Sequence, residues 1–200
     1  IWIKTNELKE TKDRQVFLLK YDAEDKVKSG YGIALTTKKD SVKPEVYWKD
    51  KEGKGAWYTF SELSIKPDEW WLLNLSFRDN QYLGLHAAKI NEEGKVELQL
   101  LGGYHVDEVG LPSSDSPLFI GAPQNSEFRG RIGPVLVLNG ESSGAELSRT
   151  FKSYAKDPFS LPDGISKGAV VLNINNGRQD SSPKENMVVP IRVKVPRINQ

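Results

Sequence analysis

The chain has 200 residues, enough for one domain with a substantial buried core, and it carries 28 Lys and Arg against 27 Asp and Glu. The net charge of +1 gives no reason to expect nucleic acid or an acidic membrane as the main partner. Because there is no cysteine, disulfides, thiolate nucleophiles and cysteine-bound zinc are excluded. No apolar run of the sequence approaches the ~20 residues that span a bilayer.

Short strands are predicted in the first third of the chain. Residues 1–5, 15–21 and 30–35 are rich in β-compatible side chains and are separated by charged or Gly-containing turns. Two aromatic strands, 44–48 and 56–60, flank a hydrophilic hairpin with glycine. Since the first residue is not Met and residues 1–5 resemble a strand interior, we expect a piece of a longer parent chain.

The middle of the chain continues with strands. Residues 67–77 and 82–89 predict two of them, and residues 91–94 predict a turn. The clean alternation of residues 95–100 predicts a strand with one solvent-facing side. Residues 102–116 are rich in Gly, Pro, Ser and acidic side chains, which predicts a loop.

The most informative stretch follows this loop. Residues 116–121 and 128–139 predict strands separated by a polar link. Val135 to Leu138 are apolar without alternation, which favours a strand buried on both faces. Ser143 and Glu146 have the spacing of a capping box, so one short helix is predicted near 143–155.

The last forty residues or so return to strand character. Residues 168–177 predict one strand, and residues 187–196 alternate with prolines that suit an edge strand. We expect a sandwich over residues 1–160, with residues 161–200 either completing it or starting a further module. Completion is favoured, because a sheet lacking its first strand would leave an open, aggregation-prone edge.

One stretch carries a resemblance to a known family. Residues 118–121 and 128–139 follow the pattern L-F-I-G…F-R-G-x-I-x-x-V-x-V-x-N, and Leu147, Phe151 and Tyr154 have the spacing of a short helix. This order resembles the end of a concanavalin A-like, laminin G-like jelly-roll domain. The resemblance implies an all-β fold, an antiparallel sandwich of two sheets.

No catalytic constellation is present in the sequence. Hydrolases with a jelly-roll fold need two carboxylates in an E-x-D-x-[x]-E spacing, which does not occur here. No nucleophile-elbow, Walker, zincin or dinucleotide fingerprint occurs either. We therefore expect the chain not to be an enzyme, and a glycoside hydrolase is the least favoured alternative.

Histidine and acidic residues offer two weaker sites. His86 falls in a predicted strand and is interpreted as structural, whereas His105 falls in the predicted loop and is the better ligand-binding candidate. The family resemblance implies calcium as a ligand, and Asp107, Glu108 and Asp115 would supply hard oxygen ligands. The favoured interpretation is that these three residues belong to a solvated acidic loop.

Aromatic residues offer a carbohydrate-binding surface, since aromatic faces stack on the C–H surfaces of sugars. Alternation along the two aromatic strands should turn at least one aromatic side chain of each outward. The favoured interpretation, however, is that both Trp lie in the core and both Tyr stabilise the sheet surface. The candidate ligand-binding residues are Tyr47, Trp48, Trp57, Tyr58, Tyr104 and His105.

The sequence thus favours a recognition module that binds carbohydrate in a secreted or cell-surface protein. The main alternative is a protein-interaction module of a large scaffold, including intracellular scaffolds of the BEACH-domain type, for which a cytoplasmic location follows. The expected partners are a glycan or a partner protein, together with the other domains of a longer parent chain. Neither nucleic-acid binding nor membrane insertion is expected.

Overall fold

The structure is a computed structural model that describes residues 1–6, 14–20, 30–38, 41–49, 54–78, 82–106, 118–121, 128–138, 149–150, 153 and 168–172. Strands dominate this part of the chain, and the helical residues in it are 149, 150 and 153. Most of the helix predicted near 143–155 lies outside the described residues. No helix in the described ranges combines the length and the apolar character needed to cross a bilayer.

The strands are β1 (Trp2–Thr5), β2 (Gln15–Lys20), β3 (Tyr31–Lys38), β4 (Ser41–Lys49), β5 (Gly55–Thr59), β6 (Trp70–Arg78), β7 (Tyr82–Ile90), β8 (Val96–His105), β9 (Leu118–Ile120), β10 (Gly130–Ile132), β11 (Val135–Leu138) and β12 (Gly168–Leu172).

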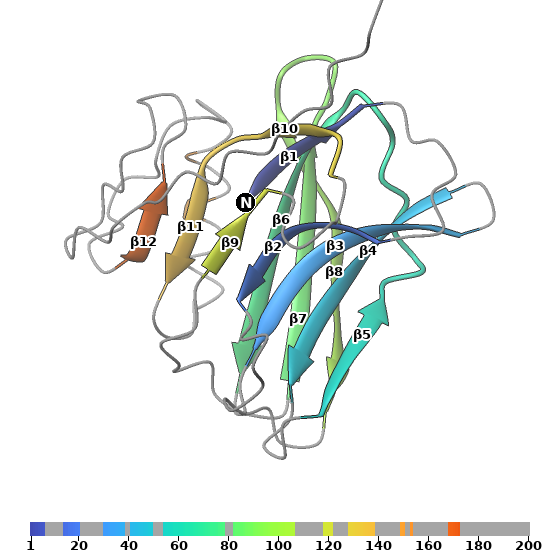
Figure 1. Cartoon of the computed structure of the whole chain (residues 1–200). Coiled ribbons are helices and arrows are strands. Elements are labelled where there is room, and N and C mark those ends of the chain that lie inside the picture. The colour runs from blue at the N-terminus through green and yellow to red at the C-terminus, as the bar shows by residue number, and fades with distance from the viewer. Residues whose placement is uncertain are drawn as a thin grey trace, which may run out of the picture.

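Two five-stranded antiparallel sheets face each other (Figure 1). One, here named the β6 sheet, has the order β10-β1-β6-β7-β8, and the other, the β3 sheet, has the order β5-β4-β3-β2-β9. Strands remote in sequence are neighbours, since β1 lies between β6 and β10, and β9 pairs with β2. The predicted all-β sandwich is therefore confirmed, with an architecture compatible with a jelly roll.

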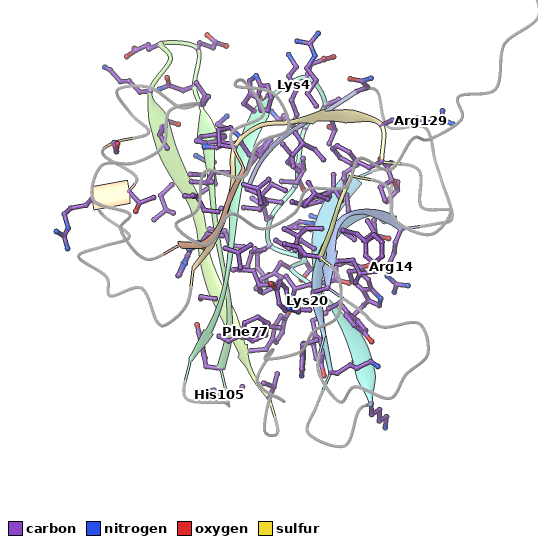
Figure 2. The ribbon with its side chains drawn as sticks, turned by 60° about the vertical axis from the view of Figure 1, so that its left-hand side comes forward. Lys4, Arg14, Lys20, Phe77, His105 and Arg129 are labelled. Atoms are coloured by element: carbon purple, nitrogen blue, oxygen red, sulfur yellow. The ribbon has the colours of Figure 1, made fainter. Side chains whose placement is uncertain are left out.

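The main core fills the space between the two sheets. In β6, Trp71 and Leu73 face this core while Leu72 faces away, as period-2 alternation requires. Tyr31 of β3 and Phe77 of β6 meet across the core with ring centroids 6.0 Å apart. Figure 2 shows Phe77 projecting between the sheets. Burial of these inward faces supplies the main drive for sandwich formation.

A second apolar cluster lies on the outer face of the β6 sheet. Trp2, Leu72 and Ala88 are buried there, and Leu136 of β11 packs against them. Its neighbour Val135 is fully buried in the main core. The apolar run of β11 thus has contacts on both faces, which explains why it does not alternate.

The strand β12 pairs with β11 in an antiparallel two-stranded sheet (Figure 1). The division of the chain near residue 160 stays a prediction. The strand predicted at residues 187–196 lies outside the described residues.

The predicted loop over 102–116 is wrong at its start, because β8 continues to His105. Gly102 and Gly103 pair with Leu85 and Gly84 of β7, so backbone pairing extends the strand past residues that locally favour a loop.

Candidate functional site

The structure separates the predicted aromatic ligands onto two faces of the β3 sheet. Tyr47 of β4 and Trp57 of β5 are direct cross-strand partners on the outer face. Trp48 is 4% exposed in the main core and stacks on Tyr58, with ring centroids 3.7 Å apart. Each strand therefore turns one aromatic side chain outward, and the favoured interpretation, in which both Trp lie in the core, is wrong for Trp57.

Tyr104 also belongs to the interior rather than to a ligand surface. Its ring lies 5.6 Å from that of Tyr58, and its hydroxyl donates a 2.8 Å hydrogen bond to the carbonyl oxygen of Thr59. Burial, with the negative charge of Glu62, raises the pKa of the Tyr104 phenol. This hydrogen bond connects β8 to β5 across the sandwich.

The outer aromatic pair is held in place by close packing on the sheet. The rings of Tyr47 and Trp57 have centroids 5.2 Å apart and planes inclined by 38°. A Cβ at Gly55 would overlap the Tyr47 hydroxyl, so the tyrosine ring lies directly across this glycine. Both rings are partly buried, which leaves part of each aromatic surface open to solvent.

A polar pair adjoins the aromatic pair. The carboxylate of Glu45, 2% exposed, accepts hydrogen bonds from Arg14 Nε at 2.5 Å and from Thr59 Oγ1 at 2.7 Å. The guanidinium of Arg14 lies 5.2 Å from the centroid of the Trp57 ring, in a cation–π position. Figure 2 places Arg14 on the outward side of the β3 sheet. We call the surface formed by Arg14, Glu45, Tyr47, Trp57 and Thr59 the aromatic face.

Sequence reasoning missed Arg14, Glu45 and Thr59. The pairing of Glu45 with Thr59 follows from the register that aligns Tyr47 with Trp57, so a correct hairpin register would have revealed it. Arg14 lies 31 residues from Glu45 in sequence, and no local pattern signals their contact.

His105 lies apart from this surface, at the end of β8 in the other sheet (Figure 2). Its exposed ring is 5.7 Å from that of Tyr82, its cross-strand partner. His86 lies on the same face of the β6 sheet, with Nδ1 3.4 Å from Asn74 Nδ2. The predicted ligand set therefore does not form one site.

The predicted calcium ligands Asp107, Glu108 and Asp115 lie outside the described residues. Within the part of the chain that the structure describes, no group of three or more His, Asp or Glu side chains could hold a metal ion. The calcium site stays a prediction.

Neither a protein-family model nor a curated protein matches the chain. A solved structure that does match is aspergilloglutamic peptidase from Aspergillus niger, with 9% identity over 66% of this chain and 77% of that chain, at a TM-score of 0.29. The expectation that the chain is not an enzyme is corrected by this match to a peptidase, and we withdraw the exclusion of catalysis. At this similarity, no catalytic residue or mechanism carries over.

Proposed function

We propose that the chain is a carbohydrate-recognition module of a secreted or cell-surface protein, built on a concanavalin A-like, laminin G-like sandwich. The observation that carries the proposal is the outward pair of Tyr47 and Trp57, whose rings lie side by side next to a fixed carboxylate and a guanidinium. Sugar rings present apolar C–H faces together with hydroxyls. The aromatic face offers surfaces for both.

The rigidity of the aromatic face supports this proposal. The Glu45 carboxylate is buried and each of its oxygens accepts a hydrogen bond, so it fixes Arg14 and Thr59 beside the aromatic pair before a ligand binds. The side chain of Arg14 is 47% exposed. Its guanidinium can donate hydrogen bonds to a sugar hydroxyl or carboxylate.

A glycan array with the full 200-residue chain, with and without calcium, tests the proposal. We expect binding to a subset of glycans and a loss of about tenfold or more in affinity for Trp57→Ala, because an aromatic stacking partner is removed. The matched control is His105→Ala, an exposed aromatic change on the other sheet, which should retain binding.

Circular dichroism and thermal melting of each variant establish that the fold is retained. Silence of the folded wild-type chain across a broad array would contradict the proposal and favour a protein-interaction module. Equal binding by wild type and folded Trp57→Ala would place the ligand elsewhere on the molecule.

A further inference from the structure

We propose that the aromatic face is one end of a longer apolar stripe, and that this stripe binds a linear oligosaccharide whose chain runs across the strands of the β3 sheet. The inference rests on the proposed function and extends it, because it names the class of glycan and two further binding residues, Leu19 and Phe119. The stripe consists of one residue from each of the five strands: Phe119, Leu19, Gly32, Tyr47 and Trp57.

The register of the β3 sheet places these five residues in a single row. Tyr47 lies opposite both Trp57 and Gly32, and Leu19 lies opposite both Gly32 and Phe119. Directly opposite residues of paired strands point to the same face of a sheet. The row therefore crosses the whole sheet from β5 to β9, in the strand order seen in Figure 1.

The row lies on the outer face of the sheet. Leu18 and Ile120 pack in the main core, so alternation turns their chain neighbours Leu19 and Phe119 outward. Neither of these two outward residues belongs to the main core, and both are partly exposed, as is the aromatic pair. The partly open apolar surface thus continues beyond the aromatic pair to the opposite edge of the sheet.

A glycine in the middle does not interrupt the stripe. A Cβ at Gly32 would come within 2.8 Å of the Leu19 Cδ1 atom, so the leucine side chain lies over the glycine. The Tyr47 ring lies in the same way across Gly55 on the other side. Leu19 and Tyr47 therefore cover the positions where the glycines have no side chain, and no charged residue stands in the row.

The length and the border of the stripe suit a sugar chain. Neighbouring strands lie about 4.8 Å apart, so the row spans roughly 19 Å from β9 to β5. Several pyranose rings fit along this length, whereas Tyr47 and Trp57 alone serve only a short ligand. In the adjacent row, Glu45 lies opposite Thr59 and is bound by Arg14. A linear oligosaccharide can place its ring faces on the stripe and direct hydroxyls toward this polar border.

The narrowness of the stripe favours a sugar chain over a protein partner. A stable protein interface buries about 800 Å² on each side. Four partly exposed side chains in one row supply much less than this area. Val16 and Ala34, which lie in the adjacent row, are buried and add little. A sugar chain is itself narrow and needs no broad surface.

Calorimetric titration with oligosaccharides of increasing length tests the inference. The probes are the cello-, laminari-, xylo- and manno-oligosaccharides, each from the monosaccharide to the hexasaccharide. In a series that binds, we expect the affinity to rise about tenfold or more from the disaccharide to the tetrasaccharide, because the added rings reach Leu19 and Phe119. Longer chains should gain little, since the row ends at β9.

Phe119→Ala should lower the affinity for the tetrasaccharide about tenfold and leave that for the disaccharide unchanged, because Tyr47 and Trp57 hold the short ligand. Phe119→Leu keeps apolar bulk in β9 and should show a smaller loss, again for the tetrasaccharide alone. The control Tyr82→Ala removes a partly buried aromatic side chain from the β6 sheet and should bind both lengths like wild type.

Binding that does not depend on chain length would overturn the inference and leave the proposed function in place. The same holds if the folded Phe119 variants bind like wild type or lose affinity equally for both lengths. Silence of all four series would also overturn the inference. Binding on the glycan array would then retain the proposed function, whereas a silent array would remove both.

Discussion

His86 is a half-buried base on the outer face of the β6 sheet, beside Asn74. Burial disfavours the charged imidazolium and lowers its pKa below the ordinary value of 6.5. The unfolded chain therefore binds this proton more readily than the native protein. The contribution of His86 to the free energy of unfolding is constant well above pH 6.5. It falls as the pH drops from 6.5 toward the lower pKa of the native protein.

We predict an NMR titration midpoint for His86 below 6.5. Urea unfolding over the same acidic range should show a smaller loss of stability in His86→Gln than in wild type, because the variant cannot take up this proton. A midpoint at or above the ordinary value would contradict the prediction.

At the scale of single elements, a close backbone approach holds β10 against β1. Gly130 pairs with Thr5, and a Cβ at Gly130 would overlap the Lys4 carbonyl oxygen and come within 2.8 Å of the Phe128 ring. Backbone atoms of a paired strand cannot move aside without breaking the pairing. Gly130→Ala should therefore destabilise the protein by about 1–3 kcal/mol, measured by urea unfolding.

Gly102 in β8 provides the matched control for this substitution. A Cβ there meets its nearest neighbours, Leu100 and Phe60, at 3.5 and 3.6 Å, which is ordinary van der Waals contact. Gly102→Ala should change stability by less than about 0.5 kcal/mol. A similar cost for both glycine variants would contradict the role of close approach at Gly130, because the entropy term of a Gly→Ala change favours the folded state at both positions.

At the scale of the whole molecule, stability depends on the core shared by the two sheets. Leu73 is fully buried in that core, whereas Leu98 of β8 is 54% exposed. We predict that Leu73→Ala lowers the free energy of unfolding by about 2–5 kcal/mol, through lost burial and the cavity left behind. Leu98→Ala removes the same atoms and should cost less than about 0.5 kcal/mol.

Chemical denaturation of both leucine variants measures this difference. Comparable costs at the two positions would mean that Leu98 is covered in solution, and that the edge strand β8 has a further contact.

Much of the sandwich could be predicted from local patterns. Alternation at residues 95–100 and the apolar run at Val135 to Leu138 correspond to β8 and β11 in the structure. The end of β8 could not be predicted, because Gly102 and Gly103 favour a loop locally and become strand only through pairing with β7.

The candidate site was predicted only in part. The sequence indicated that each aromatic strand turns one ring outward, since adjacent side chains of a strand point to opposite faces. It did not separate Trp48 from Trp57, because both are equally apolar. That choice depends on which face of β4 and β5 meets the β6 sheet.

The sequence by itself thus determined an all-β class and the positions of most strands, because period-2 alternation and turn residues are properties of short segments. Only the tertiary structure decided that Tyr47 and Trp57 face outward and that Arg14 reaches Glu45 beside them. Tyr47 and Trp57 lie on neighbouring strands of one hairpin, but burial of the common core decides which face of this hairpin turns outward and brings Arg14 beside it.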